Sequence, residues 1–227
     1  MNARIEIKWK DRDIPESTRT NWQAIVNLLA QIFEIPAALI MRVQPPEIEV
    51  FVASRNDGNP YQEGSREELM GLYCTHVMQT GKRLLLPNAR KDPKWENNPD
   101  VKLNMISYLG YPIRWPDGSP FGTLCVLDSK ENPYSSQVIE ILKHFRTLIE
   151  EHLLYLEKME ELKQLENEMH NLKKLIAKCS YCGGVKNSDG LWQSFERFLR
   201  NERGISITHG ICPECAQKEI DKLEEMD

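Results

Sequence analysis

The apolar positions at the start of the chain follow a helical period first and a strand-like pattern next. Five of them recur at the spacing of one helix face: Trp22, Ile25, Val26, Leu29 and Phe33. This spacing predicts a helix over 21–33. Two apolar runs, at 37–43 and 48–54, then predict strands, because the Gln-Pro-Pro-Glu linker at 44–47 can continue neither of them.

The pattern goes on to predict a second helix and three more strands. Residues 66–80 predict a helix that Gly81 ends, and residues 84–87 predict a short strand. Strands at 107–115 and 123–127 are separated by Pro-Asp-Gly-Ser, which is a strong turn signal. Helices and strands therefore alternate within one mixed domain.

A long helix is predicted over 135–178, with Ser135 or Ser136 as its N-terminal cap. Apolar residues recur at every seventh position along it: Leu148, Tyr155, Leu162, Met169 and Ile176. Leu165 and Leu172 fill the second apolar position of the last two heptads. A seam of this length predicts a coiled coil and therefore a parallel homodimer.

Other apolar residues of the same helix lie on a different stripe: Leu142, Phe145, Ile149, Leu153 and Leu156. This stripe predicts that the first part of the helix packs on the sheet. A single helix folded back along its own domain is the alternative to the dimer. The segment after Glu150 would project roughly 40 Å, and a lone helix of that length would leave its apolar seam in water.

Composition excludes several classes of function. The chain has 227 residues and a formal net charge of −5, with a pI of about 5.7. A general binder of nucleic acid or of anionic membranes would carry a basic patch instead. No apolar run approaches the roughly 20 residues of a membrane span, and the opening MNARIEIKWK lacks the apolar core of a signal peptide. The cytoplasm is therefore the expected location.

Four cysteines near the C-terminus form two C-x-x-C pairs: Cys179, Cys182, Cys212 and Cys215. Two glycines follow Cys182 and a proline follows Cys212, and these residues favour tight turns around the sulfur atoms. In a chain expected in the cytoplasm, two such pairs predict a Zn²⁺ ion held by four thiolates. Four thiolates leave no open coordination position, so the predicted zinc ion is structural.

Two other interpretations of these pairs stay open. Disulfides would need an oxidising compartment. A thioredoxin-like redox pair would need a strand before the motif, whereas a long helix is predicted before Cys179. His209, three residues before Cys212, is either a donor to one of the thiolates or an alternative fourth ligand.

Four stretches of the mixed domain resemble motifs of the GAF family. Residues 73–78, YCTHVM, resemble the helix that precedes the ligand side of these domains. Residues 85–93, LLPNARKDP, resemble the "VPDAR-DPRF" stretch of the family. Residues 108–113, YLGYPI, and 122–128, GTLCVLD, resemble its "YAGAPL" strand and its closing "GTLCVID" strand. The resemblance covers roughly half of the chain.

The resemblance implies an α+β fold, in which helices flank an antiparallel sheet and a small molecule binds between the sheet and a loop region. The predicted loop over 88–106 is long for a compact domain, and such loops are often functional. The resemblance and this loop give six candidate ligand contacts: Tyr73, Arg90, Asp92, Trp95, Asn97 and Tyr108. In the alternative interpretation, Trp95 only anchors the loop on the sheet and the polar side chains are solvated.

The C-terminal segment resembles a small cysteine-rich module that is appended to bacterial PAS, GAF and receiver proteins. The pattern of this module is C-S-x-C, a tryptophan and HGICPEC, which match residues 179–182, Trp192 and residues 209–215. Between the two cysteine pairs, Leu191, Trp192, Phe195, Phe198 and Leu199 give an apolar face at helical spacing, and residues 205–208 predict a short strand.

The predicted organisation has four parts. An N-terminal extension at 1–17 precedes a GAF domain at 18–137. The long coiled-coil helix at 138–178 leads to a zinc-binding module at 179–227, which ends in a short helix.

These parts predict a non-catalytic sensory protein. Its GAF domain would bind a small ligand or a signalling partner, and the dimeric helix would signal to the zinc module. One alternative is an enzyme, a thiol-dependent reductase of free methionine sulfoxide that uses Cys74 and Cys125, although both cysteines are expected in the core. The other alternative is a nucleic-acid-binding regulator that acts through the zinc module, whose charge balance is only mildly basic.

Overall fold

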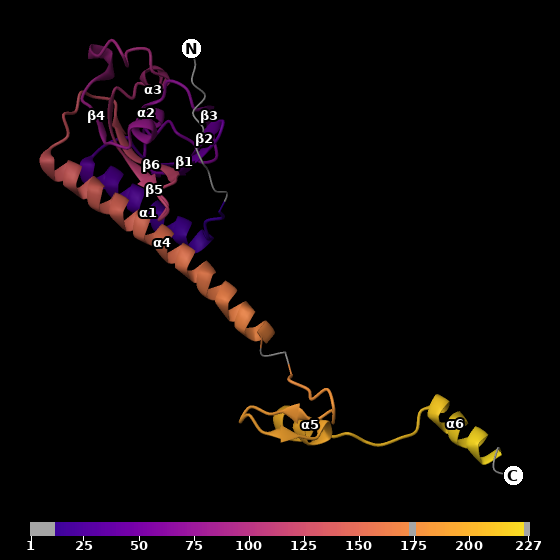
Figure 1. The fold of residues 1–227 in the computed structure, drawn as a ribbon. Helices are drawn as coiled ribbons and strands as arrows, with labels where there is room; N and C mark the ends of the chain where they lie inside the picture. The colour runs from indigo at the N-terminus through magenta and orange to yellow at the C-terminus, as the bar shows by residue number, and fades with distance from the viewer. Residues whose placement is uncertain (1–11, 173–175, 225–227) are drawn as a thin grey trace. The chain divides into compact units, whose positions relative to one another are not determined.

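The chain folds into two compact units, Met1–Glu161 and Leu162–Asp227, which we call the N-terminal and C-terminal units (Figure 1). The computed structural model describes residues 12–172 and 176–224. Helix α4, Ser136–Leu172, belongs to both units, because it runs without a break across their boundary.

The N-terminal unit is built on one six-stranded sheet. Its strands are β1 (Ala37–Gln44), β2 (Glu47–Ala53), β3 (Arg66–Glu68), β4 (Leu84–Leu86), β5 (Ser107–Arg114) and β6 (Pro120–Asp128). They lie in the order β3-β2-β1-β6-β5-β4, and every neighbouring pair is antiparallel. The predicted α+β fold, with an antiparallel sheet flanked by helices, is therefore confirmed.

Helices α1 (Glu16–Phe33) and α4 cover one face of this sheet (Figure 1). Three rings in the core between them, those of Trp22, Phe51 and Phe121, meet edge to face with centroids 5.4 and 6.0 Å apart. The stripe of α4 that was predicted to pack on the sheet does so: Leu142, Ile149 and Leu153 are buried in the core, and Phe145 and Leu156 pack against it partly buried. Trp22 also donates from Nε1 to Nδ1 of His152 on α4, at 3.0 Å.

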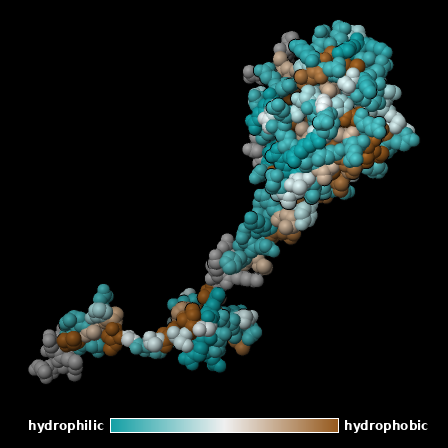
Figure 2. Space-filling view, turned by 180° about the vertical axis from the view of Figure 1, so that it is seen from behind, coloured by the Kyte–Doolittle hydropathy of each residue, from teal (hydrophilic) through white to brown (hydrophobic). Residues whose placement is uncertain are grey.

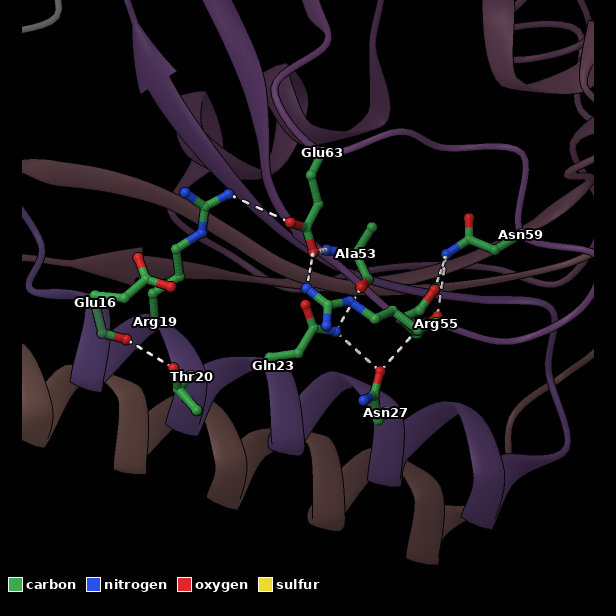
Figure 3. A network of polar contacts seen from close by, with 10 residues as sticks. Glu16, Arg19, Thr20, Gln23, Asn27, Ala53, Arg55, Asn59 and Glu63 are labelled. Carbon is green, nitrogen blue, oxygen red and sulfur yellow. Dashed lines mark hydrogen bonds and ion pairs between the residues drawn. The ribbon is translucent and has the colours of Figure 1, made fainter.

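Polar contacts tie α1 to the segment that follows β2 (Figure 3). Gln23 Nε2 donates to the carbonyl oxygen of Ala53 at 2.7 Å, and Asn27 Oδ1 accepts from the backbone N–H of Arg55 at 2.8 Å. The guanidinium of Arg55 in turn lies 3.8 Å from the carboxylate of Glu63. The helix is therefore held on the sheet by polar contacts as well as by its apolar face.

Helix α2 (Tyr73–Thr80) and the connection between β4 and β5 cover the opposite face, where a second core lies. The connection contains a 3₁₀ turn (Ala89–Lys91) and the short helix α3 (Pro99–Lys102). Gly81 ends α2 in the left-handed conformation, with φ of 64°. Asn98 caps α3, because its side chain accepts from the backbone N–H of Asp100 at 3.0 Å.

The prediction of one helix over 66–80 was wrong in its first half. Residues Arg66–Glu68 pair with β2 as an edge strand, where the guanidinium of Arg66 lies 3.9 Å from the carboxylates of Glu47 and Glu49. Gly71 then takes a φ of 75°, which a right-handed helix does not allow. Strand pairing with a distant segment therefore overrides the local helical pattern.

The C-terminal unit contains a hairpin and two helices: β7 (Val185–Lys186), β8 (Trp192–Gln193), α5 (Phe195–Arg203) and α6 (Pro213–Glu224). Val185 and Phe198 are its buried apolar side chains among the described residues. Ser194 caps α5 by accepting from the backbone N–H of Arg197 at 3.3 Å. The predicted short C-terminal helix corresponds to α6.

Two element predictions for this region were wrong. Helix α4 was expected to reach residue 178, but residues 176–178 are not helical. The carbonyl oxygen of Ala177 accepts from the N–H of Lys186 at 2.9 Å, and Lys178 forms a β-bridge with Val185, so this stretch joins the hairpin instead. Residues 205–208 form no strand, and within the described chain no second strand pairs with them.

Candidate functional site

Five polar or sulfur-bearing side chains lie together in the second core, between α2 and strands β5 and β6. We call them the buried polar cluster: Tyr73, Cys74, Tyr108, Thr123 and Cys125. Thr123 and Cys125 are two residues apart on β6 and therefore face the same side of the sheet. Helix α2 packs on both β5 and β6, which brings its first turn over this part of the sheet.

The phenol ring of Tyr108 fills the space that Gly110 leaves open. The β5–β6 register pairs Gly110 with Cys125, and a Cβ atom built on Gly110 would lie 2.1 Å from Tyr108 Oη. Any larger residue at this position would displace the phenol of Tyr108. The ring places Tyr108 Oη 3.5 Å from the sulfur of Cys74.

Aromatic rings close the cluster on the side of the β4–β5 connection. The ring of Tyr73 lies 4.9 Å from that of Tyr108 and 5.2 Å from that of Trp95, measured between centroids. Trp95 also meets the ring of His76 at 5.5 Å, and Lys94 Nζ lies 4.6 Å from the Trp95 centroid. Trp95 therefore anchors the connection on the second core while contacting a candidate ligand residue.

A half-buried carboxyl group, that of Asp100, adds charge near the cluster. Tyr61 Oη donates to Asp100 Oδ1 at 2.6 Å. Burial raises the pKa of Asp100 to about 6, helped by the negative charge of Glu67 and opposed by the hydrogen bond from Tyr61. Burial and the charge of Asp100 in turn raise the pKa of Tyr73 and of Tyr61. The phenols are therefore hydrogen-bond donors at neutral pH.

The hydroxyl group of Tyr73 is a buried donor that is not used within the described structure. No hydrogen-bond partner lies within reach of Tyr73 Oη there, although the residue is fully buried. Thr75 Oγ1, on the same helix, is buried in the same state. A buried polar group without a partner costs about 1–3 kcal/mol, so these hydroxyls are places where a bound molecule would gain hydrogen bonds.

The two thiols of the cluster contact each other and are not equivalent. The neighbouring thiol of Cys125 and the hydroxyl of Tyr108 lower the pKa of Cys74, although burial acts in the opposite direction. The same contact with Cys74, together with burial, raises the pKa of Cys125. Cys74 also lies in the first turn of α2, where the helix dipole favours a thiolate. Cys74 is therefore the more acidic thiol of the pair.

The GAF domain model matches residues 18–153, which is more than half of the chain. The chain belongs to the GAF domain family. GAF domains are found in sensory and signalling proteins. No curated protein matches the chain.

Solved GAF structures share the fold at low sequence identity. The blue-light-absorbing form of the PixJ GAF domain from Thermosynechococcus elongatus is 15% identical, with a TM-score of 0.55 over 68% of this chain and 94% of that one. The GAF domain of a phosphoenolpyruvate-protein phosphotransferase from Acinetobacter is 14% identical, with a TM-score of 0.51 over 63% and 86%. A type II free methionine-R-sulfoxide reductase from Thermoplasma acidophilum is 14% identical, with a TM-score of 0.50 over 61% and 93%. At these identities the likeness establishes the fold alone.

The six candidate ligand contacts divide into two groups on the GAF domain. The buried group is Tyr73, Trp95 and Tyr108. The surface group is Arg90, Asp92 and Asn97, of which Asp92 is half-buried. Arg90 Nη2 donates to Asn104 Oδ1 at 3.1 Å, and Asp92 Oδ1 accepts from the N–H of Lys94 at 2.9 Å. Arg90 and Asp92 make local contacts within the β4–β5 connection of the GAF domain, and the exposed Asn97 lies on the same connection, so none of the three joins the buried cluster.

Three residues of this GAF face were not predicted from the sequence: Tyr61, Asp100 and Thr123. Alternation along the strand was a usable signal for Thr123, because it places this residue beside Cys125. Tyr61 and Asp100 are 39 residues apart, and no local pattern indicates their contact.

Each predicted zinc-binding pair forms a turn that prepares its first sulfur atom for a metal. Backbone N–H groups of Cys182 and Tyr181 donate to the sulfur of Cys179 and lower its pKa. The N–H of Cys215, and more weakly that of Glu214, does the same for Cys212. Such turns and thiolate donors fit zinc. Across the described parts of the chain, however, no three metal-ligating side chains come together, and His209 is exposed.

In the described ranges, no helix has both the length and the apolar character that a membrane span requires.

Proposed function

We propose that this protein is a non-catalytic sensory protein of the cytoplasm. Its GAF domain binds a small ligand or a signalling partner at the buried polar cluster. A homodimer formed through α4 then passes the resulting change to a structural zinc module in the C-terminal unit.

The observation that carries the proposal is the double role of α4. One stripe of this helix is buried in the core of the GAF domain. A second stripe is exposed (Figure 2). Four of its residues have the predicted seven-residue spacing, Leu148, Tyr155, Leu162 and Met169, and Leu165 fills the second apolar position of its heptad. A solvated stripe of large apolar side chains on a long helix is typical of an interface that a second helix covers.

The ligand-binding part of the proposal is supported by the buried hydroxyl of Tyr73. A small molecule with a carbonyl or a similar acceptor would satisfy this donor within an aromatic surrounding, as in many small-molecule sites. The ring of Trp95, which comes from the long connection between β4 and β5, lies 5.2 Å from the ring of Tyr73 and adds to this aromatic surrounding.

The zinc part of the proposal is supported by the two cysteine turns. Cys179, Cys182, Cys212 and Cys215 would supply four thiolates, and a zinc ion would hold the second turn, which opens α6, against the first. His209 would lie beside this site and donate to one of the thiolates. The C-terminal unit buries few apolar side chains in its described residues, so metal binding would supply much of its folding free energy.

The burial of Cys74 and Cys125 argues against a reductase of methionine sulfoxide. Cys74 is 8% exposed and Cys125 only 1%, beneath α2. A sulfoxide substrate would have to displace this helix before its sulfur atom could reach either thiol. We therefore favour the sensory function over the reductase, and we propose no nucleic-acid ligand.

Native mass spectrometry of the full-length protein tests this proposal. We expect a dimer that carries one zinc ion per chain. The double variant Leu162→Asp and Met169→Asp should be monomeric, because it buries two carboxylates in the seam. The matched control, Gln164→Asp with Asn167→Asp, adds the same charge off the seam and should remain dimeric.

Each part of the proposal has its own refuting outcome. A monomeric parent protein, or a dimer that survives the seam substitutions, would exclude signalling through a paired α4. A metal-free chain whose C-terminal unit resists proteolysis would exclude the zinc module. A small-molecule library is added to the parent protein and to Tyr73→Phe. If no compound gives the parent a mass shift that Tyr73→Phe loses, ligand binding at the buried polar cluster is excluded.

A further inference from the structure

Two cysteines of the chain lie outside the zinc-binding pairs, and the fold brings them together. Cys74 is on α2 and Cys125 is on β6, 51 residues further along the chain. Both side chains are buried in the second core. Tyr108 contacts Cys74 and covers Gly110, which is the register partner of Cys125, so the two thiols lie beside each other. The sensory function proposed above makes no use of this contact.

The surroundings of the two thiols are more polar than packing alone requires. Tyr108 Oη lies 3.5 Å from Cys74 Sγ, and Gly110 leaves the space that lets the phenol reach it. Thr123, two residues before Cys125 on the same face of β6, also buries its hydroxyl here, without a hydrogen-bond partner among the described residues. Burying hydroxyl groups is costly unless they are hydrogen-bonded, so alanine or valine would fill this site at lower cost if packing were its only role.

We propose that Cys74 and Cys125 are a redox-active pair, which a hydroperoxide converts into an intrachain disulfide that links α2 to β6. The GAF domain would then respond to oxidants as well as to its ligand. A cellular dithiol would restore the reduced state by thiol–disulfide exchange.

The chemistry needs only the two thiols and the peroxide. The Cys74 thiolate attacks one peroxide oxygen, so that an S–O bond forms, the O–O bond breaks, and the leaving oxygen takes a proton and departs as water or an alcohol. The sulfur of Cys125 then attacks the sulfenic acid at Cys74. The S–S bond forms, the S–O bond breaks, and the hydroxyl group leaves as water with the proton of the Cys125 thiol. The two thiols lose two electrons, which the peroxide gains.

The geometry assigns the order of these steps. Cys74 is the more exposed thiol, at 8% against 1% for Cys125, so that a molecule as small as a peroxide reaches it first. Hydrogen bonds and its place at the start of α2 favour its thiolate, which is the reactive form. Cys125 is already in contact with it and acts as the resolving thiol. Because this second thiol is adjacent, the sulfenic acid is removed before further oxidation.

Differential alkylation followed by mass spectrometry tests this pair in the reduced, full-length protein. After treatment with hydrogen peroxide, trypsin should release a cross-linked product that joins the peptides 67–82 and 115–130. Its mass should be lower than the sum of the two peptides by two hydrogen atoms, and dithiothreitol should separate them. These peptides contain no other cysteine, so oxidation of the C-terminal pairs does not affect the result.

Variants separate this chemistry from accidental oxidation. Cys125→Ser should stop at a sulfenic acid on Cys74 that dimedone traps, whereas Cys74→Ser should leave Cys125 unmodified. Tyr108→Phe should slow cross-linking by roughly tenfold, the loss expected for one hydrogen bond to a thiolate. Tyr111→Phe is the matched control, because its phenol is on the same strand but belongs to the core that α1 and α4 cover, and its rate should equal that of the parent.

Two outcomes would overturn the proposal. In the first, peroxide oxidises the C-terminal cysteines, but Cys74 and Cys125 of the same sample are still fully alkylated by iodoacetamide that is added after unfolding. In the other, cross-linking occurs only when urea has unfolded the chain first, which would mean that the folded domain does not bring the sulfur atoms into reach. Neither outcome depends on whether a ligand or a zinc ion binds.

Discussion

The carboxyl group of Asp100 should make the stability of the GAF domain fall as the pH rises, and Asp100→Asn should remove this dependence. The raised pKa means that the folded domain holds the proton more tightly than the unfolded chain, where the ordinary value is 3.8 and the folded value is about 6. Below the unfolded pKa both forms are protonated and the stabilisation is complete. As the pH rises through the folded pKa, it is lost.

The size of this effect follows from the two pKa values. A difference of one pKa unit is worth about 1.4 kcal/mol, so the change from 3.8 to about 6 amounts to about 3 kcal/mol of unfolding free energy. Urea unfolding at several pH values between about 3 and 7 measures it. The free-energy difference between the parent and Asp100→Asn should shift by about 3 kcal/mol in favour of the variant over this range.

The control for this measurement is Asp57→Asn, which removes an exposed carboxylate from the same unit. The reasoning would be refuted if the parent and Asp100→Asn showed the same pH dependence. That result would mean that water or a rearranged side chain solvates the Asp100 carboxylate. Tyr61→Phe adds a second check, because losing the hydrogen bond from Tyr61 should raise the pKa of Asp100 further and steepen the loss of stability.

Two further predictions concern packing on either face of the sheet. His152→Ala should lower the unfolding free energy by about 1–3 kcal/mol, because it leaves the buried Nε1–H of Trp22 without its acceptor; His144→Ala, at an exposed position of the same helix, is the control. Gly110→Ala should cost about 1–3 kcal/mol and displace the phenol of Tyr108, seen as a changed near-ultraviolet circular dichroism spectrum, because the added Cβ would lie 2.1 Å from Tyr108 Oη. Unchanged unfolding midpoints in either variant would contradict the contacts on which these values rest.

The sequence predicted those parts of the fold in which the spacing of apolar residues follows directly from which side chains are buried. The stripe at Leu142, Ile149 and Leu153 is visible in the helical period, and these residues pack in the core between α4 and the sheet. Segment 66–68 was not predictable in this way. It has the sequence Arg-Glu-Glu, which shows no strand alternation, and becomes a strand only because the edge of β2 offers it backbone partners.

The candidate site was predictable in part, for a related reason. Tyr73 and Tyr108 lie on a helix and a strand, where periodicity indicates the buried side, and both were found in the second core. Arg90 and Asn97 lie in the β4–β5 connection, where no period indicates the direction of a side chain, and both are exposed. The contact of Cys74 with Cys125 needs the packing of α2 across the sheet, which the separate local patterns do not contain.

Strand β6 contributes side chains to both cores, because its successive residues face opposite sides of the sheet. Cys125 and Leu127 face α2, whereas Leu124 and Val126 lie in the core that α4 covers. A displacement of this strand on one side must therefore move side chains on the other, because closely packed interiors transmit small shifts. The hydroxyl of Tyr134, just before α4, donates to the carbonyl oxygen of Val126 at 3.3 Å. A ligand or a disulfide beneath α2 would therefore act on α4 through the N-terminal end of α4. We expect the coupling between the GAF site and the exposed seam of α4 to weaken most when the contact at this end is removed, as in Tyr134→Phe.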